Sequence, residues 1–448
     1  MTRKCYVDCT NTLYDDLNTG IQRVVRNIIG RCSVKVDDVE FVPVFASYGE
    51  FYTYTLTKGN PLFVTKALNR LLGNIRNAMD GLFADVSVRK RYCEKSGHEG
   101  LTGNREIIHS YIISRAREIL PFILKLPFAI DRKLFNIREV CIEPGDILFL
   151  PDVFWNTALI DSLKNNNKLG AVNILLIHDI FPVLFPEFVD EGNVSGFMQH
   201  ISYVFTWADG VVSVSRSSLD EIRKFGTLLG EYPEYDYFHP GADFRSENEP
   251  MGTVRPTLAE FFEGSSTFLM VGTIEPRKNH QYVLKAFKTL WERGEQVKLC
   301  LIGKIGWKCR DIIDEINSSP LRNLRLFMIN DASDVELRYC YTYAKATIIA
   351  SVAEGFGLPL VEALHFGKMA FASDIPVFHE IGNDAPIFFS LDSPDSLVEK
   401  IIEFQNSCHC VVRKHAATQN WDVSVNDLFR KVISMSASIR AKRLLSES

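Results

Sequence analysis

The sequence predicts an α/β protein in which two doubly wound domains flank a central cleft. In both halves of the chain, short apolar runs rich in β-branched residues alternate with segments of helical periodicity. This alternation is typical of parallel strands joined by right-handed crossovers. At 448 residues the chain is too long for one compact core, and the polar stretch DFRSENEPMGTVRPT at 243–257 indicates a linker. A cleft between two such domains is a usual place for a ligand.

The first half, 1–245, is expected to form the first of the two domains. Five of its runs predict buried strands, namely KCYVDCT (4–10), EFVPVF (40–45), GDILFLPD (145–152), AVNILLIHD (171–179) and ADGVVSVS (208–215). Helical periodicity predicts helices at TGIQRVVRNIIG (19–30) and SLDEIRKFG (218–226).

The second half, 258–425, is expected to form the second domain, and its strands and helices alternate more regularly. Its predicted strands are STFLMVGT (266–273), VKLCLIGK (297–304), LRLFMIN (324–330), ATIIASVA (346–353) and KMAFASD (368–374), with helices near 279–293, 309–317, 333–345 and 358–367. The remaining stretch, 426–448, predicts a helix.

Composition excludes several classes of protein. A charged fraction of 23%, a hydrophobic fraction of 46% and a net charge of −5 show no basic excess that would indicate nucleic-acid binding. The N-terminus has no signal-peptide core and no apolar stretch approaches 18 residues, so a cytoplasmic protein is expected. The ten scattered cysteines indicate reduced thiols. The tight cluster Cys408-His409-Cys410 has no second ligand pair nearby, and no metal site is expected.

One segment, 67–138, does not fit a minimal fold of this kind. It is mostly of helical pattern and locally basic, with RKRY at 89–92 and an apolar run flanked by cations at 114–135. Such a segment is typical of peripheral contact with an anionic membrane surface, at the inner face of the membrane. The alternative is an inserted helical subdomain, which Pro121 and Pro127 favour because they interrupt a continuous amphipathic face.

The stretch EGFGLPLVE, 354–362, joins a predicted strand to a predicted helix. Pro359 suits the first helical turn, and Gly355 and Gly357 allow a sharp turn or a close approach to a ligand. Glu354 then lies in the loop and Glu362 about one turn into the helix, so both can face a crevice at the carboxyl end of a strand. A purely structural role, with carboxylates placed near a helix N-terminus, is equally open for this motif alone.

A second loop, VGTIEPRKN, places Arg277 and Lys278 just before a helix that Asn279 could cap. Cations beside free helix N–H groups suit phosphate, although a solvated basic turn is the alternative. Loops at the same edge of a parallel sheet face one crevice. Cations in one loop and carboxylates in another suit a nucleotide sugar, because carboxylates accept hydrogen bonds from ribose hydroxyls.

The first half supplies candidates for the other side of the crevice. His178 and Asp179 follow the predicted strand VNILLI at its carboxyl end, and Arg216 follows another strand in the same way. Arg23 and Arg26 lie three residues apart on a predicted helix and could meet an anionic acceptor, or could be solvated surface charges. Asp179, Arg23 and Arg216 are therefore candidate ligand-binding residues of this half.

Together these motifs resemble the retaining glycosyltransferases of family four, which have the GT-B fold of two facing Rossmann-like domains. GTIEPRKN, EGFGLPLVEAL, ASDIPVFHEIG and NWDVSVNDL carry the resemblance from about Phe268 to Asp422. TGIQRVVRNI, EPGDILFLPDVFW and LLIHDIFPVLFPE look like bacterial members, often mannosyltransferases, that build O-antigens and other surface polysaccharides.

The resemblance implies that 1–245 is the acceptor-binding domain, that 258–425 is the donor-binding domain, and that the helix at 426–448 crosses back to the N-terminal domain. The candidate acceptor-binding residues are then Asp179, Arg23 and Arg216.

The resemblance also implies a role for each matching residue of the donor site. Glu354 would contact the transferred sugar, Glu362 the ribose, and Lys278 with Arg277 the diphosphate, while His178 would lie beside the donor sugar. The other implied donor-binding residues are Gly20, Thr273, Gly355, Phe356, Gly357 and Leu358. Many members have an arginine at the position of Thr273, and Arg277 could replace that charge.

The expected function is transfer of a hexose, with GDP-mannose as the best donor candidate, to a glycan or lipid-linked glycan acceptor. No cofactor and no metal are expected, because no Asp-x-Asp motif accompanies the donor loops. Other donors such as dTDP-rhamnose or UDP-sugars stay open. The alternatives are a nucleotide-sugar epimerase of the same fold and a non-catalytic nucleotide-sugar binding protein. A glycoside hydrolase is disfavoured because it has no need of a phosphate loop.

Overall fold

The chain folds into two compact units. The computed structural model describes residues 3–14, 19–32, 34–47, 50–53, 130–134, 136–152, 163–166, 168–244, 252–264, 266–407 and 419–447. The first unit comprises Met1–Asp8, Asn18–Val42 and Ile142–Ser448, and the second comprises Cys9–Leu17 and Pro43–Cys141. Both parallel sheets described next belong to the first unit, on either side of the expected linker at 243–257. The boundaries expected at 1–245, 258–425 and 426–448 stay a prediction.

The first sheet has nine strands, and five of them form its parallel part, in the order β1-β6-β7-β8-β9. Their bounds are β1 (Arg3–Asp8), β6 (Ile147–Leu150), β7 (Val172–Ile177), β8 (Gly210–Ser213) and β9 (Glu234–Tyr237). Every side chain of β6, β7 and β8 is buried. This explains why their sequences are continuous apolar runs rather than alternating ones, since a parallel sheet is covered on both faces.

Six parallel strands form the second sheet, in the order β12-β11-β10-β13-β14-β15. Their bounds are β10 (Ser266–Val271), β11 (Val297–Ile302), β12 (Leu326–Ile329), β13 (Ala346–Ile349), β14 (Met369–Ser373) and β15 (Ile387–Phe389). The strand order reverses between β10 and β13. The loops at their carboxyl ends therefore diverge and leave a crevice, which is where open parallel sheets bind ligands.

Helices join the strands of both sheets. In the first half they are α2 (Gly20–Ile29), α6 (Phe181–Leu184), η1 (Pro186–Phe188), α7 (Glu191–Trp207) and α8 (Arg216–Leu229). In the second they are α9 (Pro256–Phe262), η2 (Pro276–Lys278), α10 (His280–Glu292), α11 (Arg310–Ser318), α12 (Asp334–Tyr343), α13 (Leu358–His365), α14 (Pro376–Gly382) and α15 (Pro394–Asn406). Thr19 with Gln22 and Ser333 with Glu336 form capping boxes that fix where α2 and α12 begin.

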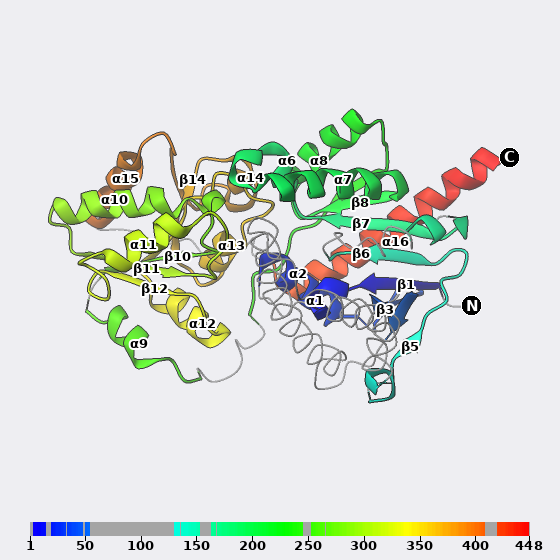
Figure 1. Cartoon of the computed structure of the whole chain (residues 1–448), viewed down its shortest axis with the longest axis horizontal. Helices are drawn as coiled ribbons and strands as arrows, with labels where there is room; N and C mark the ends of the chain where they lie inside the picture. Colours follow the sequence, from blue (N-terminus) through cyan, green and yellow to red (C-terminus); the bar gives the residue numbers. More distant parts are fainter. Residues whose placement is uncertain are drawn as a thin grey trace, which may run out of the picture. The chain divides into compact units, whose positions relative to one another are not determined.

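An aromatic core covers one face of the second sheet. Phe268 of β10 meets Phe287 of α10 edge to face, with ring centroids 5.7 Å apart, and Phe371 of β14 meets Phe404 of α15 in the same way at 5.5 Å. In Figure 1, α10 and α15 lie on one side of this sheet and α12 lies on the other. Burial on both faces anchors the strand ends that carry the loops of the site.

The C-terminal helix α16 (Trp421–Glu447) lies against strands of the first sheet. It contacts β7, β8 and β9. Trp421 is buried beside Gly241, where any Cβ would come within 2.4 Å of the Trp421 nitrogen. Further along, Phe429 stacks on Phe41 with ring centroids 3.7 Å apart. The helix predicted at 426–448 is thus present, and it begins at Trp421, five residues earlier than predicted.

The second unit contains short antiparallel strands. β3 (Val39–Ser47) begins in the first unit, where it pairs with β2 (Lys35–Val36), and in the second unit pairs antiparallel with β4 (Glu50–Thr53). β4 pairs antiparallel with β5 (Arg138–Glu139), and α1 (Thr10–Tyr14) belongs to the same unit. Most of the segment 67–138 lies outside the described residues, as does the cluster at 408–410. None of the described helices combines the length and apolarity needed to cross a bilayer.

All ten predicted strands are present, and the structure adds elements that the sequence pattern did not indicate. β9 has the sequence EYDY and all four of its residues are only partly buried, so it lacks the apolar run expected of a parallel strand. β15 is three residues long. Both lie at sheet edges, where burial is weaker and the pattern carries less information.

Candidate functional site

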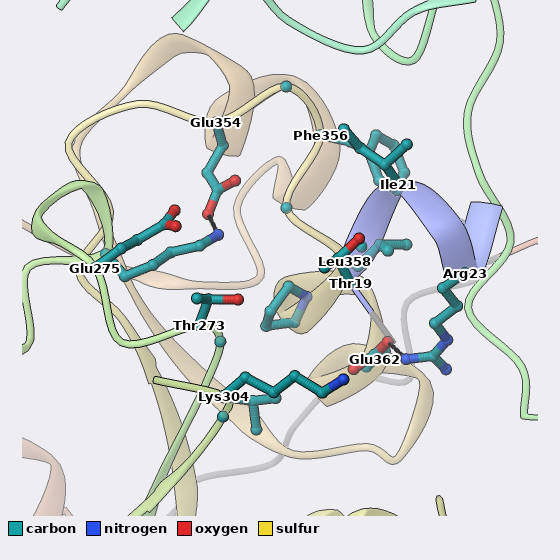
Figure 2. A pocket seen from close by; sticks show the side chains of 18 of the residues that line it. Thr19, Ile21, Arg23, Thr273, Glu275, Lys304, Glu354, Phe356, Leu358 and Glu362 are labelled. Atoms are coloured by element: carbon teal, nitrogen blue, oxygen red, sulfur yellow. Dashed lines mark hydrogen bonds and ion pairs between the residues drawn. The ribbon is translucent and has the colours of Figure 1, made fainter. Parts of the chain in front are cut away.

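Loops from both sheets line a cavity of about 570 Å³ within the first unit. Thirteen of the fourteen candidate residues line it. They are Gly20, Arg23, His178, Asp179, Thr273, Arg277, Lys278, Glu354, Gly355, Phe356, Gly357, Leu358 and Glu362. Figure 2 shows side chains of several of these loops facing the same space. The volume falls within the range of small-molecule sites.

Lys278 and Glu354 form an ion pair at one side of this cavity (Figure 2). Ser351 donates a second hydrogen bond to Glu354 Oε1, at 2.7 Å. Burial opposes ionisation of Glu354, but the charges of Lys278 and Arg277 outweigh it and hold its pKa below the ordinary value. Glu354 is therefore an anion at neutral pH, fixed in direction by three neighbours.

Arg277 links the loop after β10 to the loop after β7. Its guanidinium donates to Glu275 Oε1 at 2.9 Å and to Asp179 Oδ2 at 3.0 Å, and lies 3.9 Å from Glu354 Oε2. It also sits 5.1 Å from the centre of the Phe181 ring. Burial opposes its charge, but these carboxylates raise its pKa. Arg277 thus joins the loops after β7, β10 and β13 through ion pairs with their carboxylates.

Glu362 is buried near the first turn of α13 and contacts two side chains. Arg23 of α2 forms an ion pair with Oε1, and Tyr341 donates its hydroxyl hydrogen to Oε2 at 2.7 Å. Burial raises the pKa of Glu362 above its ordinary value, although Arg23 acts against this. Arg23 also lies over the ring of Phe244, 4.3 Å from its centre. The candidate acceptor residue Arg23 is therefore held against a candidate donor residue.

The two glycines of the EGFG loop are required by contacts within the protein. A Cβ on Gly355 would come within 2.4 Å of the His178 carbonyl oxygen, and one on Gly357 within 2.6 Å of the Phe378 ring. Gly357 also has a φ of 93°, which strongly favours glycine. Ser215 and Ser218 of the first half donate to the Gly355 carbonyl oxygen at 2.6 and 2.9 Å. Pro359 lies in the first turn of α13, as predicted.

His178 lies at the carboxyl end of β7, as the sequence predicted. Its Nε2 is 3.1 Å from the carbonyl oxygen of Pro151, which can only accept, so Nε2 carries the hydrogen. Burial lowers the pKa of His178 below its ordinary value. The ring is therefore neutral at pH 7, and its Nδ1 can accept a hydrogen bond.

Two details differ from the sequence-based expectations. Arg216 does not line the cavity, because its guanidinium bonds the Tyr237 hydroxyl at 3.1 Å and its backbone N–H bonds Glu380 Oε1 at 2.7 Å. Asn279 does precede α10, but its side chain makes no capping hydrogen bond. The structure therefore gives no support to a role for Arg216 in this cavity.

The cavity also contains side chains that the sequence reasoning missed, among them Glu275, Lys304, Trp307, Asp331 and Asp334. Lys304 lies two residues after the last residue of β11, and Thr273 lies two residues after the last residue of β10. The rule that applied to the other loops, a polar residue at the carboxyl end of a parallel strand, could have found it. Among the described residues, no group of three or more His, Cys, Asp or Glu side chains could hold a metal ion.

Comparisons with known proteins agree with this geometry. A family model described as "Glycosyl transferases group 1" matches residues 259–413. Serotype-specific mannosyltransferase WbdA of Escherichia coli is 31% identical over 277 residues, which cover 60% of this chain and 34% of WbdA. O-antigen chain mannosyltransferase B of Escherichia coli is 29% identical over 236 residues, 51% of this chain and 60% of the relative. The chain thus spans about a third of the length of WbdA.

Solved structures show the same fold at low sequence identity. Anabaena Alr3699/HepE in complex with UDP and glucose superimposes with a TM-score of 0.56 at 12% identity, over 97% of this chain and 100% of that one. The N-terminal domain of Candida albicans trehalose-6-phosphate phosphatase gives 0.57 at 11% identity, over 97% of each chain. The fold of this chain is the GT-B fold, with two Rossmann-like parallel sheets, as the sequence predicted.

Proposed function

We propose that this chain is a glycosyltransferase that moves a hexose from a nucleotide sugar to a glycan or a lipid-linked glycan. The observation that carries the proposal is the convergence of Lys278, Glu354 and Glu362 in one cavity between the strand ends of a GT-B fold. The match of residues 259–413 to group 1 glycosyl transferases supports the same reaction class.

GDP-mannose is the donor we propose. Relatives that are 23–31% identical to this chain over the aligned residues are named as mannosyltransferases, and two of them, at 29% and 23%, are named as O-antigen chain mannosyltransferases. Surface-polysaccharide synthesis is accordingly the proposed setting, and a growing O-antigen-like glycan the proposed acceptor.

The proposed donor complex uses the carboxylates and cations in separate roles. Glu362, already oriented by Arg23 and Tyr341, has free lone pairs for the ribose hydroxyls. The loop that holds Gly355, Phe356, Gly357 and Leu358 lies along the donor, with Gly20 and Thr273 at its other sides. Lys278 and Arg277 add positive charge near the diphosphate.

We propose a retaining reaction that needs no metal. The bond from the anomeric carbon to the diphosphate oxygen breaks, and the acceptor oxygen bonds that carbon on the same face. The acceptor's proton passes to the leaving phosphate. Glu354 stabilises positive charge on the sugar rather than bonding to it, since Lys278 and Ser351 already hold its carboxylate. Nδ1 of His178 accepts a hydrogen bond from a sugar hydroxyl, and Asp179 faces the acceptor.

The test is nucleotide-sugar turnover by the purified chain with and without a mannose-containing glycan. Release of a nucleoside diphosphate that depends on the glycan, in EDTA as well as in magnesium, is the expected result. Nuclear magnetic resonance of the product should show the anomeric configuration of the donor. Conversion of the nucleotide sugar without any acceptor would instead identify an epimerase. Binding without turnover of any donor would identify a non-catalytic binding protein.

A further inference from the structure

The charges around the Glu354 loop are unbalanced for an anionic ligand. Arg277 and Lys278 face three carboxylates, those of Asp179, Glu275 and Glu354, at ion-pair distances. Two cations against three anions leave this cluster with a formal charge of −1. A diphosphate brought to it would meet cations whose fields are already neutralised, and Coulomb attraction there would be weak.

The other cations of the cavity differ in whether they are already paired. Arg23 forms an ion pair with Glu362. Lys304 is exposed and lines the cavity, and within the described part of the chain its ammonium group has no hydrogen bond and no ion pair. Thr273 also lines the cavity, and its hydroxyl has no hydrogen-bond partner among the described residues. Figure 2 shows both side chains extending into the cavity from neighbouring loops.

Backbone contacts fix these two loops to each other. The Ile274 N–H donates to the Lys304 carbonyl oxygen at 2.8 Å, and the Gly306 N–H donates to the Ile274 carbonyl oxygen at 3.0 Å. These bonds extend the pairing of β10 with β11 beyond the ends of the strands. Gly303 lies so close to Gly272 that a Cβ would come within 1.8 Å of its carbonyl oxygen. The backbones of Lys304 and Thr273 are thus held side by side.

We propose that Lys304 and Thr273 add a binding site for the diphosphate of the donor to the charge supplied by Lys278 and Arg277, with Lys304 as the cation that is free to bind it. This inference rests on the proposed function and deepens it. An ammonium without a partner gives a phosphate its full charge, whereas Lys278 must first leave Glu354. Lys278 and Arg277 keep their role near the diphosphate and also position Glu354 and the loop that carries Asp179.

The test is calorimetric titration of the full chain with GDP, UDP and dTDP and with the three nucleosides that lack phosphate. For the diphosphate that the wild-type chain binds, Lys304→Ala should weaken affinity at least about tenfold. Its affinity for the matching nucleoside should stay within about twofold. Thr273→Val should weaken diphosphate binding by roughly twofold to tenfold, the usual effect of one hydrogen bond.

Matched controls separate a local effect from a general one. Lys285→Ala removes an exposed lysine of α10 that does not line the cavity, and should bind the diphosphate like the wild type. Lys304→Arg keeps the charge and should restore most of the affinity. Raising the salt concentration should weaken binding to the wild type more than to Lys304→Ala, because only the wild type has the unpaired cation.

The outcomes distinguish failure of the Lys304 site from failure of the proposed glycosyltransferase function. Diphosphate affinity of Lys304→Ala within twofold of wild type would overturn the role of Lys304 while the proposed function stands. Equal losses for diphosphate and nucleoside would also overturn it, because the change would then be structural. A wild-type chain that binds none of the three diphosphates would overturn the proposed function and the phosphate site together.

Discussion

Glu354 is the residue at which burial and charge compete most directly in this protein. A carboxylate in so enclosed a position is costly unless partners hold it. Lys278, Ser351 and Arg277 supply those partners from two loops. The consequence is an anion whose direction is fixed before any ligand arrives, which is the condition for electrostatic stabilisation in catalysis.

Removing the Lys278 ammonium tests this arrangement. Lys278→Met keeps the length of the side chain but leaves Glu354 with Arg277 as its nearest cation, so its pKa should rise and its orientation should loosen. We expect turnover to fall more than about tenfold and the thermal midpoint to fall as well. The measurements are donor turnover and thermal unfolding.

A double variant separates catalysis from stability. Lys278→Met combined with Glu354→Gln should recover most of the lost stability, because no unpaired charge remains, but not the turnover. Lys285→Met is the surface control. Near-normal turnover in Lys278→Met would contradict the proposed role of this pair.

His280 gives a prediction about pH. The ring is fully buried at the start of α10, and neither nitrogen has a hydrogen-bond partner among the described residues. Burial, with the nearby charge of Lys278, lowers the pKa of His280 to about 3. Because the unfolded chain takes up this proton near pH 6.5, stability is lost as the pH falls from about 6.5 towards 3.

The expected loss from His280 is about 2 kcal/mol at pH 5, from the difference between 6.5 and 5 at 1.36 kcal/mol per pH unit. Urea unfolding at pH 7.5 and pH 5 measures it. His280→Leu should lose correspondingly less between the two pH values. An identical loss in wild type and variant would show that other groups control the acid sensitivity.

At the scale of elements, close approaches between backbones decide where the functional side chains lie. The loops after β10 and β11 are joined through Gly303 and Gly272, and the EGFG loop meets the loop after β7 through Gly355. Hydrogen bonds continue the sheet into these loops. Loop side chains can therefore be as well positioned as those on strands, which a binding site requires.

Gly303→Ala tests how much the close approach of Gly303 to Gly272 contributes to stability and to nucleotide binding. Its Cβ would lie 1.8 Å from a backbone oxygen, so one of the two loops must move. We expect a loss of at least about 1–3 kcal/mol in unfolding free energy, together with weaker nucleotide binding.

Gly196→Ala in α7 is the matched control, because its Cβ would meet nothing within 4 Å. It should raise stability by up to about 1 kcal/mol, since alanine is the better helix former. Urea unfolding checks both variants. Equal tolerance at the two positions would contradict the close approach at Gly303.

At the scale of the whole molecule, α16 completes the burial of the first sheet. The chain reaches this helix only after the second sheet is finished, yet the helix contacts β7, β8 and β9. Within the first unit, the two ends of the sequence therefore share one core.

Trp421→Ala should cost about 3–5 kcal/mol, the usual range for truncating a buried large aromatic side chain. Trp421→Phe should cost much less, because the indole nitrogen has no hydrogen-bond partner among the described residues. Val423→Ala, at an exposed position of the same helix, should change stability by less than about 0.5 kcal/mol. Denaturant unfolding of the three variants is the measurement, and a small effect of Trp421→Ala would contradict an anchoring role.

The sequence was most informative where burial is complete. ATIIASVA and VNILLI are apolar on both faces, so their pattern predicts a parallel strand without reference to the rest of the chain. Polar residues that follow such strands were thereby placed at the edge where ligands bind, and thirteen candidates do line one cavity. Edge elements such as β9 escaped prediction because their burial is partial.

The sequence by itself determined the fold class, the strand ends and the loops that carry Lys278, Glu354 and His178, because each depends on short-range periodicity and turn chemistry. Only the tertiary structure decided which charges meet. Arg23 pairs with Glu362 across 339 positions of the chain, and Arg277 with Asp179 across 98. Such pairings depend on how the sheets pack, so the sequence could name the charged residues but not identify Lys304 as a cavity cation that has no partner among the described residues.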